Sequence, residues 1–516
     1  MKTVGDVIRQ RAAERPEKIA MIFGERRSSY QTLDERSNQV ANALLDWDYG
    51  SDARIAYLGK NTDFYYELFF GAAKAGVPMV AVNWRLAAEE VEYILNDACV
   101  EAIFVETEFQ PLIEACQRKC PRLKRLLSLD GDKPSAYERW MGGYGSNDPR
   151  VSIDTQTTCL QMYTSGTTGK PKGVLLSHSC FMAQRELEYL AGDWTHWNDD
   201  DVNLVAMPVF HIGGTGWGFS AFFNGATNVI HAIPDAEWII RDIGRHRITR
   251  LFAVPTFLQA IVETAKAMAT PIDSVKYVVY GASPIPESLL KEAVSLFGCD
   301  FVQLYGMTEA TGSVTYLPPE DHDENGNPRM ASCGKALPGM EIKICDPQGK
   351  ELATGTTGEI WVKSNALMTG YWGKPEATAE VLEDGWYKSG DAGYLDEDGY
   401  LYLQARIKDM IVSGGENIYP AEIESVLFAH PSVADVAVIG VPDDKWGETV
   451  KAIVVPAENE TVSYDELIAF ARSKIAGYKL PRSVDTIDTI PRNASGKILK
   501  YVLREPFWKE ENRQIG

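Results

Sequence analysis

The sequence predicts an α/β protein in two parts. The first is a large N-terminal domain of mostly parallel sheets with helices plus a β-rich subdomain, and the second is a small α+β C-terminal domain. Over roughly the first three hundred residues, short apolar runs alternate with helical patterns, which is typical of a parallel sheet covered by helices. After about residue 333, short strand-like runs separated by Gly, Pro and Asp predict the β-rich subdomain, and a further change of pattern near residue 409 marks the C-terminal unit.

The N-terminal elements follow from hydrophobic spacing. Val4, Val7 and Ile8 recur at helical intervals and predict an amphipathic helix packed on the body of the protein. Gly76 ends a later helical pattern, and segment 134–154, rich in Gly, Ser, Asp and Pro, is expected to be a connecting excursion. Strands and helices are expected to alternate over residues 54–58, 64–75, 79–82, 88–96 and 102–105.

The alternation resumes after residue 200, and each predicted strand there ends in a loop that carries Gly, Pro, His or Ser. Because ligands of such sheets bind at the carboxyl ends of the strands, these loops are expected to converge on one crevice. The predicted strands are 203–208, 250–255, 275–280 and 301–304, then 341–344 and 358–362 in the β-rich subdomain; the C-terminal unit has helices at 421–429 and 465–471 and a strand at 436–439.

Composition limits the partners. The 516 residues carry a formal net charge of −21, which argues against nucleic acid and anionic membrane surfaces but allows anionic small molecules where basic residues cluster. The eight cysteines are scattered, no secretory signal precedes them, and no apolar run is as long as a membrane span. We therefore expect a cytoplasmic protein with reduced thiols and no integral membrane contact, and a homodimer is compatible with the sequence.

One loop, residues 163–173, is the most informative stretch. Its glycines let backbone N–H groups approach an anion closely, its hydroxyls donate hydrogen bonds, and its two lysines add positive charge. The loop is therefore expected to hold a polyphosphate, and the alternative is a solvated surface turn. It is not the P-loop NTPase motif, because Pro171 follows Lys170 where that motif has Ser or Thr at the start of a helix. A strand–loop–strand is expected instead.

Two carboxylates and one histidine follow strand-like runs. Glu309, after the run 301–304, is either a solvated cap or a ligand of Mg²⁺, which takes carboxylates together with phosphate oxygens. Asp391, at the expected end of a short strand, is either a turn residue or the acceptor of both hydroxyls of a ribose. His211 precedes several glycines and is either structural or part of a cavity wall.

Two further stretches are ambiguous by themselves. Residues 405–412 interleave charges with apolar residues, which suits an exposed strand or a hinge, and Ser-Gly-Gly follows at 413–415. Lys497 follows a glycine turn near the C-terminus, where a lysine is usually exposed to solvent.

Taken together, these motifs resemble the core motifs of the adenylate-forming superfamily, which comprises acyl- and aryl-CoA synthetases, firefly luciferases and peptide-synthetase adenylation domains. The resemblance covers nearly the whole chain, and the motifs occur in the family's order. The matching stretches are 163–173, 305–309, 387–391, 406–420 and 491–497.

The resemblance implies a ligase that uses ATP, Mg²⁺ and coenzyme A. In such enzymes a carboxylate attacks the α-phosphate of Mg·ATP, giving an acyl-adenylate and pyrophosphate, and a thiol then displaces AMP. The carboxylate is already a nucleophile, so the residues are expected to position groups and neutralise charge at phosphorus.

The resemblance also implies residue roles. Lys497 bridges the carboxylate and the α-phosphate, Thr164 and Glu309 serve the Mg²⁺, and His211 stands at the mouth of the acyl pocket. The nucleotide- and CoA-binding set is Thr164, Ser165, Gly166, Thr167, Thr168, Gly169, Lys170, Lys172, Gly281, Ala282, Ser283, Gln303, Leu304, Tyr305, Gly306, Met307, Thr308, Asp391, Arg406, Lys408, Ser413, Gly414, Gly415 and Glu416.

Domain motion is a further implication. The large domain is expected to span residues 1–407 and the small, mobile domain residues 408–516, with the hinge at Lys408. In the family the small domain rotates between half-reactions, so that Lys497 is withdrawn and the loop at 413–415 lines the thiol's tunnel.

The acyl pocket is expected to take an apolar monocarboxylate, either a medium or long fatty acid or an aryl or cinnamic acid. No basic residue stands out there to pair with a second carboxylate. Because the chain ends at Gly516, soon after Lys497, free coenzyme A is the expected thiol. The alternatives are an enzyme that loads a carrier protein and a non-catalytic nucleotide-binding relative. The expected pocket residues are His211, Gly213, Gly214, Trp217, Gly281, Gly306, Met307 and Gly312.

Overall fold

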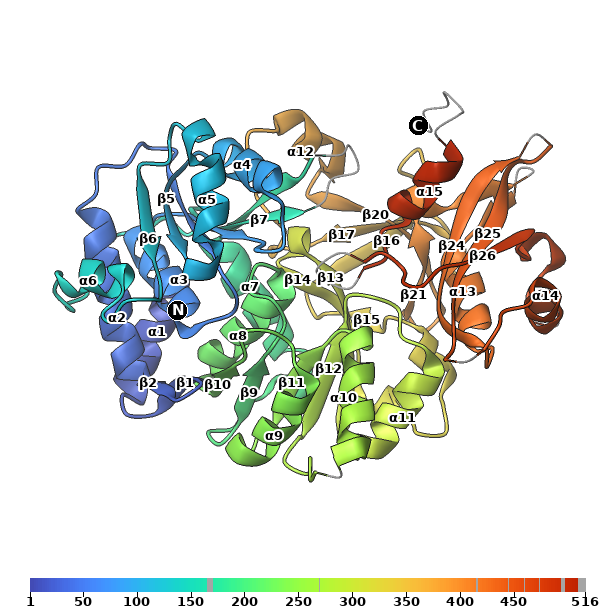
Figure 1. The fold of residues 1–516 in the computed structure, drawn as a ribbon, viewed down its shortest axis with the longest axis horizontal. Helices are drawn as coiled ribbons and strands as arrows, with labels where there is room; N and C mark the ends of the chain where they lie inside the picture. Colours follow the sequence, from blue (N-terminus) through green and yellow to red (C-terminus); the bar gives the residue numbers. More distant parts are fainter. Residues whose placement is uncertain are drawn as a thin grey trace.

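The computed structural model describes residues 1–164, 170–268, 270–413, 416–443, 445–458, 460–472, 474–492 and 497–508, with the backbone alone at 405, 406, 408, 416 and 417. The strands of this part of the chain form four sheets (Figure 1). The unit that follows residue 410 lies at the right of the view, and the N-terminal helices lie at the left. None of the described helices combines the length and the apolar character needed to cross a bilayer.

A seven-stranded sheet has the order β18-β8-β7-β4-β3-β5-β6. Its inner pairs are parallel, whereas β7 and β8 are antiparallel, as the strand–loop–strand interpretation predicts. The predicted alternation of strands and helices between residues 54 and 105 is confirmed. The strands are β3 (Arg54–Leu58), β4 (Met79–Val82), β5 (Val100–Val105), β6 (Arg125–Ser128), β7 (Thr158–Thr164), β8 (Lys172–Ser177) and β18 (Gly370–Tyr371).

A nine-stranded sheet has the order β15-β14-β13-β12-β11-β9-β10-β1-β2, and its central strands are parallel. The predicted strands 203–208 and 250–255 each included a proline at the end. The observed strands stop earlier, at Val205 and Ala253, because proline has no N–H to donate within a sheet. The strands are β1 (Ile19–Phe23), β2 (Arg26–Ser29), β9 (Val202–Val205), β10 (Thr227–Ile230), β11 (Arg250–Ala253), β12 (Tyr277–Gly281), β13 (Asp300–Met307), β14 (Gly312–Leu317) and β15 (Lys335–Ala336).

The predicted β-rich subdomain is an antiparallel sheet in which β16-β17-β20-β19 are joined by β21 on β20. One expectation is wrong here: Asp391 does not end a short strand but lies in the middle of a strand ten residues long, opposite Arg406. The strands are β16 (Glu341–Cys345), β17 (Gly358–Lys363), β19 (Leu382–Glu383), β20 (Trp386–Leu395) and β21 (Leu401–Arg406).

The C-terminal unit is an α+β structure with its own apolar core, which includes Ile411, Ile423 and Leu427. Its sheet has the order β23-β22-β25-β24, with β26 parallel to β25. The elements are β22 (Ile411–Ser413), β23 (Glu416–Ile418), α13 (Pro420–Phe428), β24 (Val433–Asp443), β25 (Gly447–Pro456), α14 (Tyr464–Arg472), β26 (Ser483–Thr486) and α15 (Lys500–Trp508).

Helices cover the two large sheets, and the excursion 134–154 contains a helix that was not predicted. Ser135 and Glu138 form a reciprocal capping box at its start, so a local sequence signal for this helix was present. The helices are α1 (Val4–Glu14), α2 (Tyr30–Leu45), α3 (Asp63–Ala75), α4 (Ala88–Asp97), α5 (Gln110–Cys116), α6 (Ala136–Gly142), α7 (His178–Tyr189), α8 (Ile212–Asn224), α9 (Ala236–His246), α10 (Pro255–Met268), α11 (Glu287–Phe297) and α12 (Pro375–Val381).

Helix α3 is the centre of the N-terminal core. All 13 of its residues are buried, and it contacts β1 of one large sheet and β4 and β7 of the other. Gly76, in the left-handed conformation, ends the helix, as the sequence predicts. A helix buried on every side is normally apolar throughout, yet α3 carries Asp63, Glu67 and Lys74.

Each of these charges is neutralised by the preceding segment. The shortest contacts are 2.5 Å from Arg26 to Asp63, 2.5 Å from Arg36 to Glu67 and 2.6 Å from Lys74 to Asp34. These pairs tie α3 to β2 and α2, and they satisfy charges that would otherwise be strongly unfavourable in the core.

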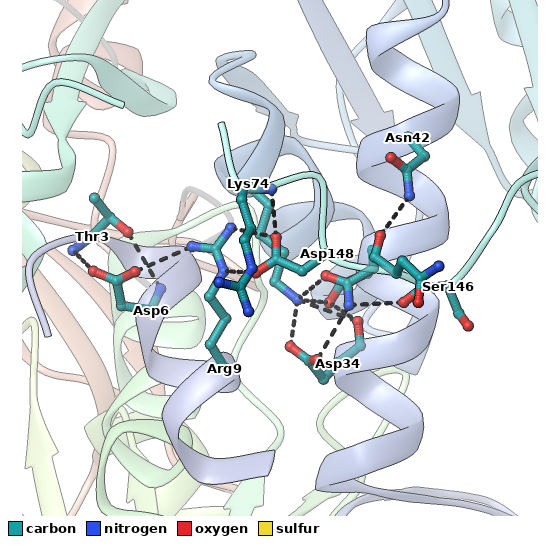
Figure 2. A network of polar contacts seen from close by, with 12 residues as sticks. Thr3, Asp6, Arg9, Asp34, Asn42, Lys74, Ser146 and Asp148 are labelled. Atoms are coloured by element: carbon teal, nitrogen blue, oxygen red, sulfur yellow. Dashed lines mark hydrogen bonds and ion pairs between the residues drawn. The ribbon is translucent and has the colours of Figure 1, made fainter. Parts of the chain in front are cut away.

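Lys74 is fully buried and donates to three side chains of α2. Its Nζ lies 2.6 Å from Asp34, 2.8 Å from Ser37 Oγ and 2.7 Å from Asn38 Oδ1. Figure 2 shows this group beside a second one, in which Arg9 of α1 joins Asp6 to Asp148. Burial lowers the pKa of Lys74 to about 8, although Asp34 acts in the opposite direction.

Removing the Lys74 ammonium should weaken this junction. Lys74→Met is expected to lower the free energy of unfolding by about 3 kcal/mol, because Asp34, Ser37 and Asn38 would lose their donor. Urea denaturation measures this change, with Lys119→Met as the control: Lys119 is an exposed lysine 3.1 Å from Glu92 and should contribute under about 1 kcal/mol. Equal effects of the two substitutions would contradict this account of α3.

Candidate active site

One large cavity, of about 1540 Å³, gathers residues from both large sheets, from β20 and from the C-terminal unit. Most of the predicted site residues with described side chains line it, including Thr164, Lys170, His211, Glu309 and Lys497. The loops at the carboxyl ends of the strands therefore do converge, as predicted from the α/β pattern.

The predicted phosphate-binding loop connects the antiparallel strands β7 and β8. Thr164 is the last residue of β7 and pairs with Lys172, the first residue of β8. Lys170 lines the cavity, whereas Lys172 does not, and its Nζ lies 5.1 Å from the ring centroid of Tyr371. Ser165, Gly166, Thr167, Thr168 and Gly169 lie outside the described residues.

Glu309 lies in a short 3₁₀ turn (Thr308–Ala310) directly after β13 and is 9% exposed. The hydroxyls of Tyr371 and Thr164 donate to its Oε1, at 3.1 Å and 3.4 Å. A carboxylate and a hydroxyl side by side are oxygen donors of the kind that Mg²⁺ prefers. Because the described residues contain no group of three or more metal-binding side chains, a cation here would need further oxygens from a bound molecule.

Asp391 is 8% exposed and accepts a hydrogen bond from Tyr305 Oη at 2.8 Å. Its own side chain does not line the cavity, but Ser389 and Tyr387 on the same strand do. The β20–β21 register places the backbone of Arg406 opposite Asp391, so the two predicted ribose-binding positions lie together.

His211 precedes α8, and its ring is enclosed in the cavity wall. Burial lowers its pKa to about 4, and the nearby charges of Arg85 and Lys497 act in the same direction. The imidazole is therefore neutral near pH 7, and its Nε2 has no partner within the described part of the chain.

Lys497 reaches the site from the C-terminal unit. Lys497 is exposed and follows residues 493–496, which are outside the described part of the chain. The next residue, Ile498, forms an isolated antiparallel β-bridge with Arg492. Lys497 lines the same cavity as Thr164 and Glu309, and it is close enough to His211 to depress the pKa of that ring. The structure thus brings together the four residues predicted to be catalytic.

The remaining residues predicted to bind the nucleotide or coenzyme A differ in where they lie and in how fully the structure describes them. Ala282, Leu304, Gly306, Met307 and Thr308 line the cavity. Gly281, Ser283, Gln303, Tyr305 and Ser413 are described but do not line it. Gly414 and Gly415 lie outside the described residues, and for Arg406, Lys408 and Glu416 only the backbone is described.

Every predicted acyl-pocket residue except Gly281 lines the cavity: His211, Gly213, Gly214, Trp217, Gly306, Met307 and Gly312. Gly214 also has a packing role. A Cβ there would lie 2.2 Å from the carbonyl oxygen of Pro208, so this glycine allows α8 to pack closely on the preceding loop.

A basic residue that the sequence did not single out lines the same cavity as the expected acyl-pocket residues. Arg185 of α7 is 5% exposed and lines the cavity. In the sequence, Arg185 stands four residues after the buried Phe181, and this spacing places both side chains on the same face of a helix. The sequence did not show that this face borders a cavity.

Asn61 holds the loop that carries His211. Its Nδ2 donates to the carbonyl oxygens of Met207 and His231, each at 3.0 Å, and its Oδ1 accepts from the Val209 N–H at 2.9 Å. Tyr65 of α3 donates to the carbonyl of Val209 at 3.1 Å. The start of the central helix therefore positions one wall of the cavity.

Comparisons with known proteins agree with this geometry. A family model described as AMP-binding enzyme matches residues 8–372, and one described as AMP-binding enzyme C-terminal domain matches residues 422–497. The chain is 40% identical over 98% of its length to the fatty acid–[acyl-carrier-protein] ligase ScoC of Streptomyces coeruleorubidus, covering 96% of that protein. It is 36% identical over 96% of its length to a feruloyl-CoA synthase of an Amycolatopsis species, covering 98% of it.

Among solved structures, the chain is similar to the o-succinylbenzoate–CoA synthetase of Bacillus subtilis. In the complex of that enzyme with its acyl-adenylate intermediate, the TM-score is 0.85 at 31% identity, over 99% of this chain and 98% of the other. In its complex with ATP and a magnesium ion, the TM-score is 0.84 at 30% identity, over 96% of this chain and 98% of the other.

The neutral state of His211 is directly measurable. In an NMR titration of protein labelled at histidine, with His211→Asn to assign the signal, the ring is expected to titrate near pH 4 rather than near 6.5. The unfolded chain would bind this proton at the higher pH, so protonation of His211 should destabilise the fold as the pH falls from 6.5 toward 4. A midpoint near 6.5 would mean that the ring is solvated.

Proposed function

The chain belongs to the family of AMP-binding enzymes, and we propose that it is an AMP-forming ligase that joins an apolar monocarboxylic acid to the thiol of coenzyme A. One observation carries the proposal. Lys497, from the C-terminal unit, lines the same cavity as Thr164 and Glu309, and this cavity is also lined by apolar side chains that include Trp217, Phe252 and Met307. Two substrates, one with phosphates and one with an apolar body, fit the two ends of such a cavity.

In the first half-reaction, a carboxylate oxygen of the acid forms a bond to the α-phosphorus of ATP, and the bond to pyrophosphate breaks. No general base is required, because the carboxylate is already ionised. The task of the protein is to hold the two anions in line and to offset the charge that builds up between them.

The residues present suit this task. Thr164 and Glu309 would hold a Mg²⁺ ion, which when bound neutralises phosphate charge. Asp391, fixed by Tyr305, would accept the ribose hydroxyls. Lys497 would place its ammonium group between the carboxylate and the α-phosphate, where attractive charge is most effective in a site that excludes water.

In the second half-reaction, the thiol sulfur attacks the acyl carbon and AMP leaves. We propose that residues 1–407 and 408–516 are the two bodies that move, with the hinge at Lys408. In the arrangement described here Lys497 lines the cavity and Ser413 does not, which suits the first half-reaction. Rotation at the hinge would exchange the two segments.

Loading of a carrier protein is the second candidate function. The specific observation in its favour is the 40% identity to an acyl-carrier-protein ligase, which exceeds the 36% identity to the feruloyl-CoA synthase. Both functions share the first half-reaction and differ only in the thiol.

The deciding experiment measures AMP release with ATP and Mg²⁺ across aliphatic acids of rising length and a set of benzoic and cinnamic acids. Each acid is assayed with free coenzyme A and, separately, with a carrier protein bearing its phosphopantetheine thiol. We expect turnover that depends on coenzyme A. Turnover with the carrier protein alone would favour the second function, and failure to form any adenylate would contradict both.

Lys497→Ala is expected to slow adenylate formation by at least ~10²–10³-fold, because one preorganised charge at the transition state is lost. Thioester formation from preformed acyl-adenylate should remain largely intact. Pyrophosphate exchange and single-turnover thiol transfer measure the two steps separately. Lys500→Ala is the matched control, since Lys500 lines the same cavity but pairs with Glu424 at 2.7 Å. Equal loss of both steps in the Lys497 variant would contradict its proposed role.

A further inference from the structure

The acyl end of the cavity is closed by a polar group of residues. Arg185 and Glu188 of α7, Ser220 of α8 and Trp194 line the large cavity, and the same residues line a second cavity of about 20 Å³ beyond it. None of Thr164, His211, Glu309 or Lys497 lines this second cavity. We call these four residues the end wall: they lie where the large cavity borders the second one, whose lining includes none of the four residues predicted to be catalytic.

The end wall limits the pocket. The second cavity has room for about one water molecule and not for an acyl chain. Trp197 and Trp217 also line it, with ring centroids 5.7 Å apart, so large rigid side chains stand behind the polar group.

Arg185 is electrically balanced where it lies. Its Nη1 is 2.7 Å from Glu188 Oε2, and its Nη2 donates to Glu188 Oε1 at 2.9 Å. Nη1 also donates to Ser220 Oγ. The Oε1 atom of Glu188 also accepts a hydrogen bond from Gln184 Nε2 at 3.1 Å. The carboxylate is thus fully engaged, and the pair carries no net charge.

Two donors of the end wall are left over. The Nε–H of Arg185 and the indole N–H of Trp194 are enclosed and have no hydrogen-bond partner among the described residues. Both side chains are more than nine-tenths buried, at 5% and 6% exposure. An enclosed donor without a partner is unfavourable, and both residues line the large cavity, so an acceptor on a bound molecule could supply the missing partner.

We infer that the acid this enzyme activates carries an uncharged hydrogen-bond acceptor, such as a ketone, ether or phenolic oxygen, at the end remote from its carboxylate. The two unpaired groups are donors, so the ligand must supply an acceptor. A second carboxylate is disfavoured, because it would lie beside Glu188 and meet a pair whose charge is already balanced. This inference rests on the proposed function and narrows its substrate class.

Matched pairs of acids test the inference. In each pair one member has the distal acceptor and the other has the same shape without it: para-methoxycinnamate against para-ethylcinnamate, and a keto fatty acid against the branched acid in which a methyl group replaces the ketone oxygen. Adenylation is followed by pyrophosphate exchange, which needs no thiol. The acceptor-bearing member is expected to have a KM at least ~10-fold lower, with a similar kcat, since the contact is made equally in the bound acid and in the transition state.

Two variants locate the effect. Arg185→Met combined with Glu188→Gln removes the charged pair without leaving an unpaired carboxylate, and the KM ratio within each pair is expected to fall, with the Trp194 N–H as the remaining donor. Trp194→Phe keeps an aromatic side chain but removes the N–H-bearing ring of the indole, and it should lower the ratio in part. Arg241→Met, which removes an exposed arginine paired with Glu237 on α9, is the control and should keep the ratio.

The outcomes are separable. No preference in the wild type, or a preference that persists in both end-wall variants, overturns the inference while adenylation of apolar acids still supports the proposed function. Adenylation of none of the acids contradicts the proposed function and the inference with it. If the double variant fails to fold, the Trp194→Phe ratio decides.

Discussion

The structure depends on the complete burial of α3 between the two large sheets. A helix in that position has no access to water, so its charged residues must be neutralised locally, and Arg26, Arg36 and Asp34 meet this requirement. The same burial fixes the residues around the start of the helix. Asn61 and Tyr65 hold the backbone of residues 207–209 and hence one wall of the cavity. A packing constraint in the core is thus also a positioning constraint for the site.

The opposite side of the site is supplied very differently. Lys497 belongs to a unit with its own apolar core, and it is an exposed residue that lines the cavity. Under the proposed function, a wall held by the core and a separately folded unit that carries Lys497 would suit chemistry in two stages, because the unit could move without disturbing the wall. His211, whose pKa is lowered to about 4 by burial, is neutral near pH 7 and adds no charge to the cavity that it lines.

The strands were predictable from the sequence because each is a short apolar run bounded by a turn residue, and this signal is local. Short motifs also singled out Glu309 and Lys497, and both residues line the cavity. The predictions failed where a residue's role depends on a distant partner. Asp391 was assigned to a strand end because nothing in the local sequence shows that its strand continues and pairs with β21, where Arg406 lies opposite Asp391. Arg185 was overlooked because its pairing with Glu188 reads as an ordinary helix pair until α8 is seen to form a cavity beside it.

The separation of the end wall from the phosphate end has an evolutionary consequence. Arg185 and Ser220 lie on α7 and α8, whereas Thr164, Glu309 and Lys497 lie on β7, on a turn after β13 and in the C-terminal unit. Under the inference above, substitutions on these two helices would change which acid is selected and leave the residues proposed for adenylation unchanged. Related proteins with this fold could then differ in the acid that they select through substitutions at a few helix positions, while the reaction stays the same.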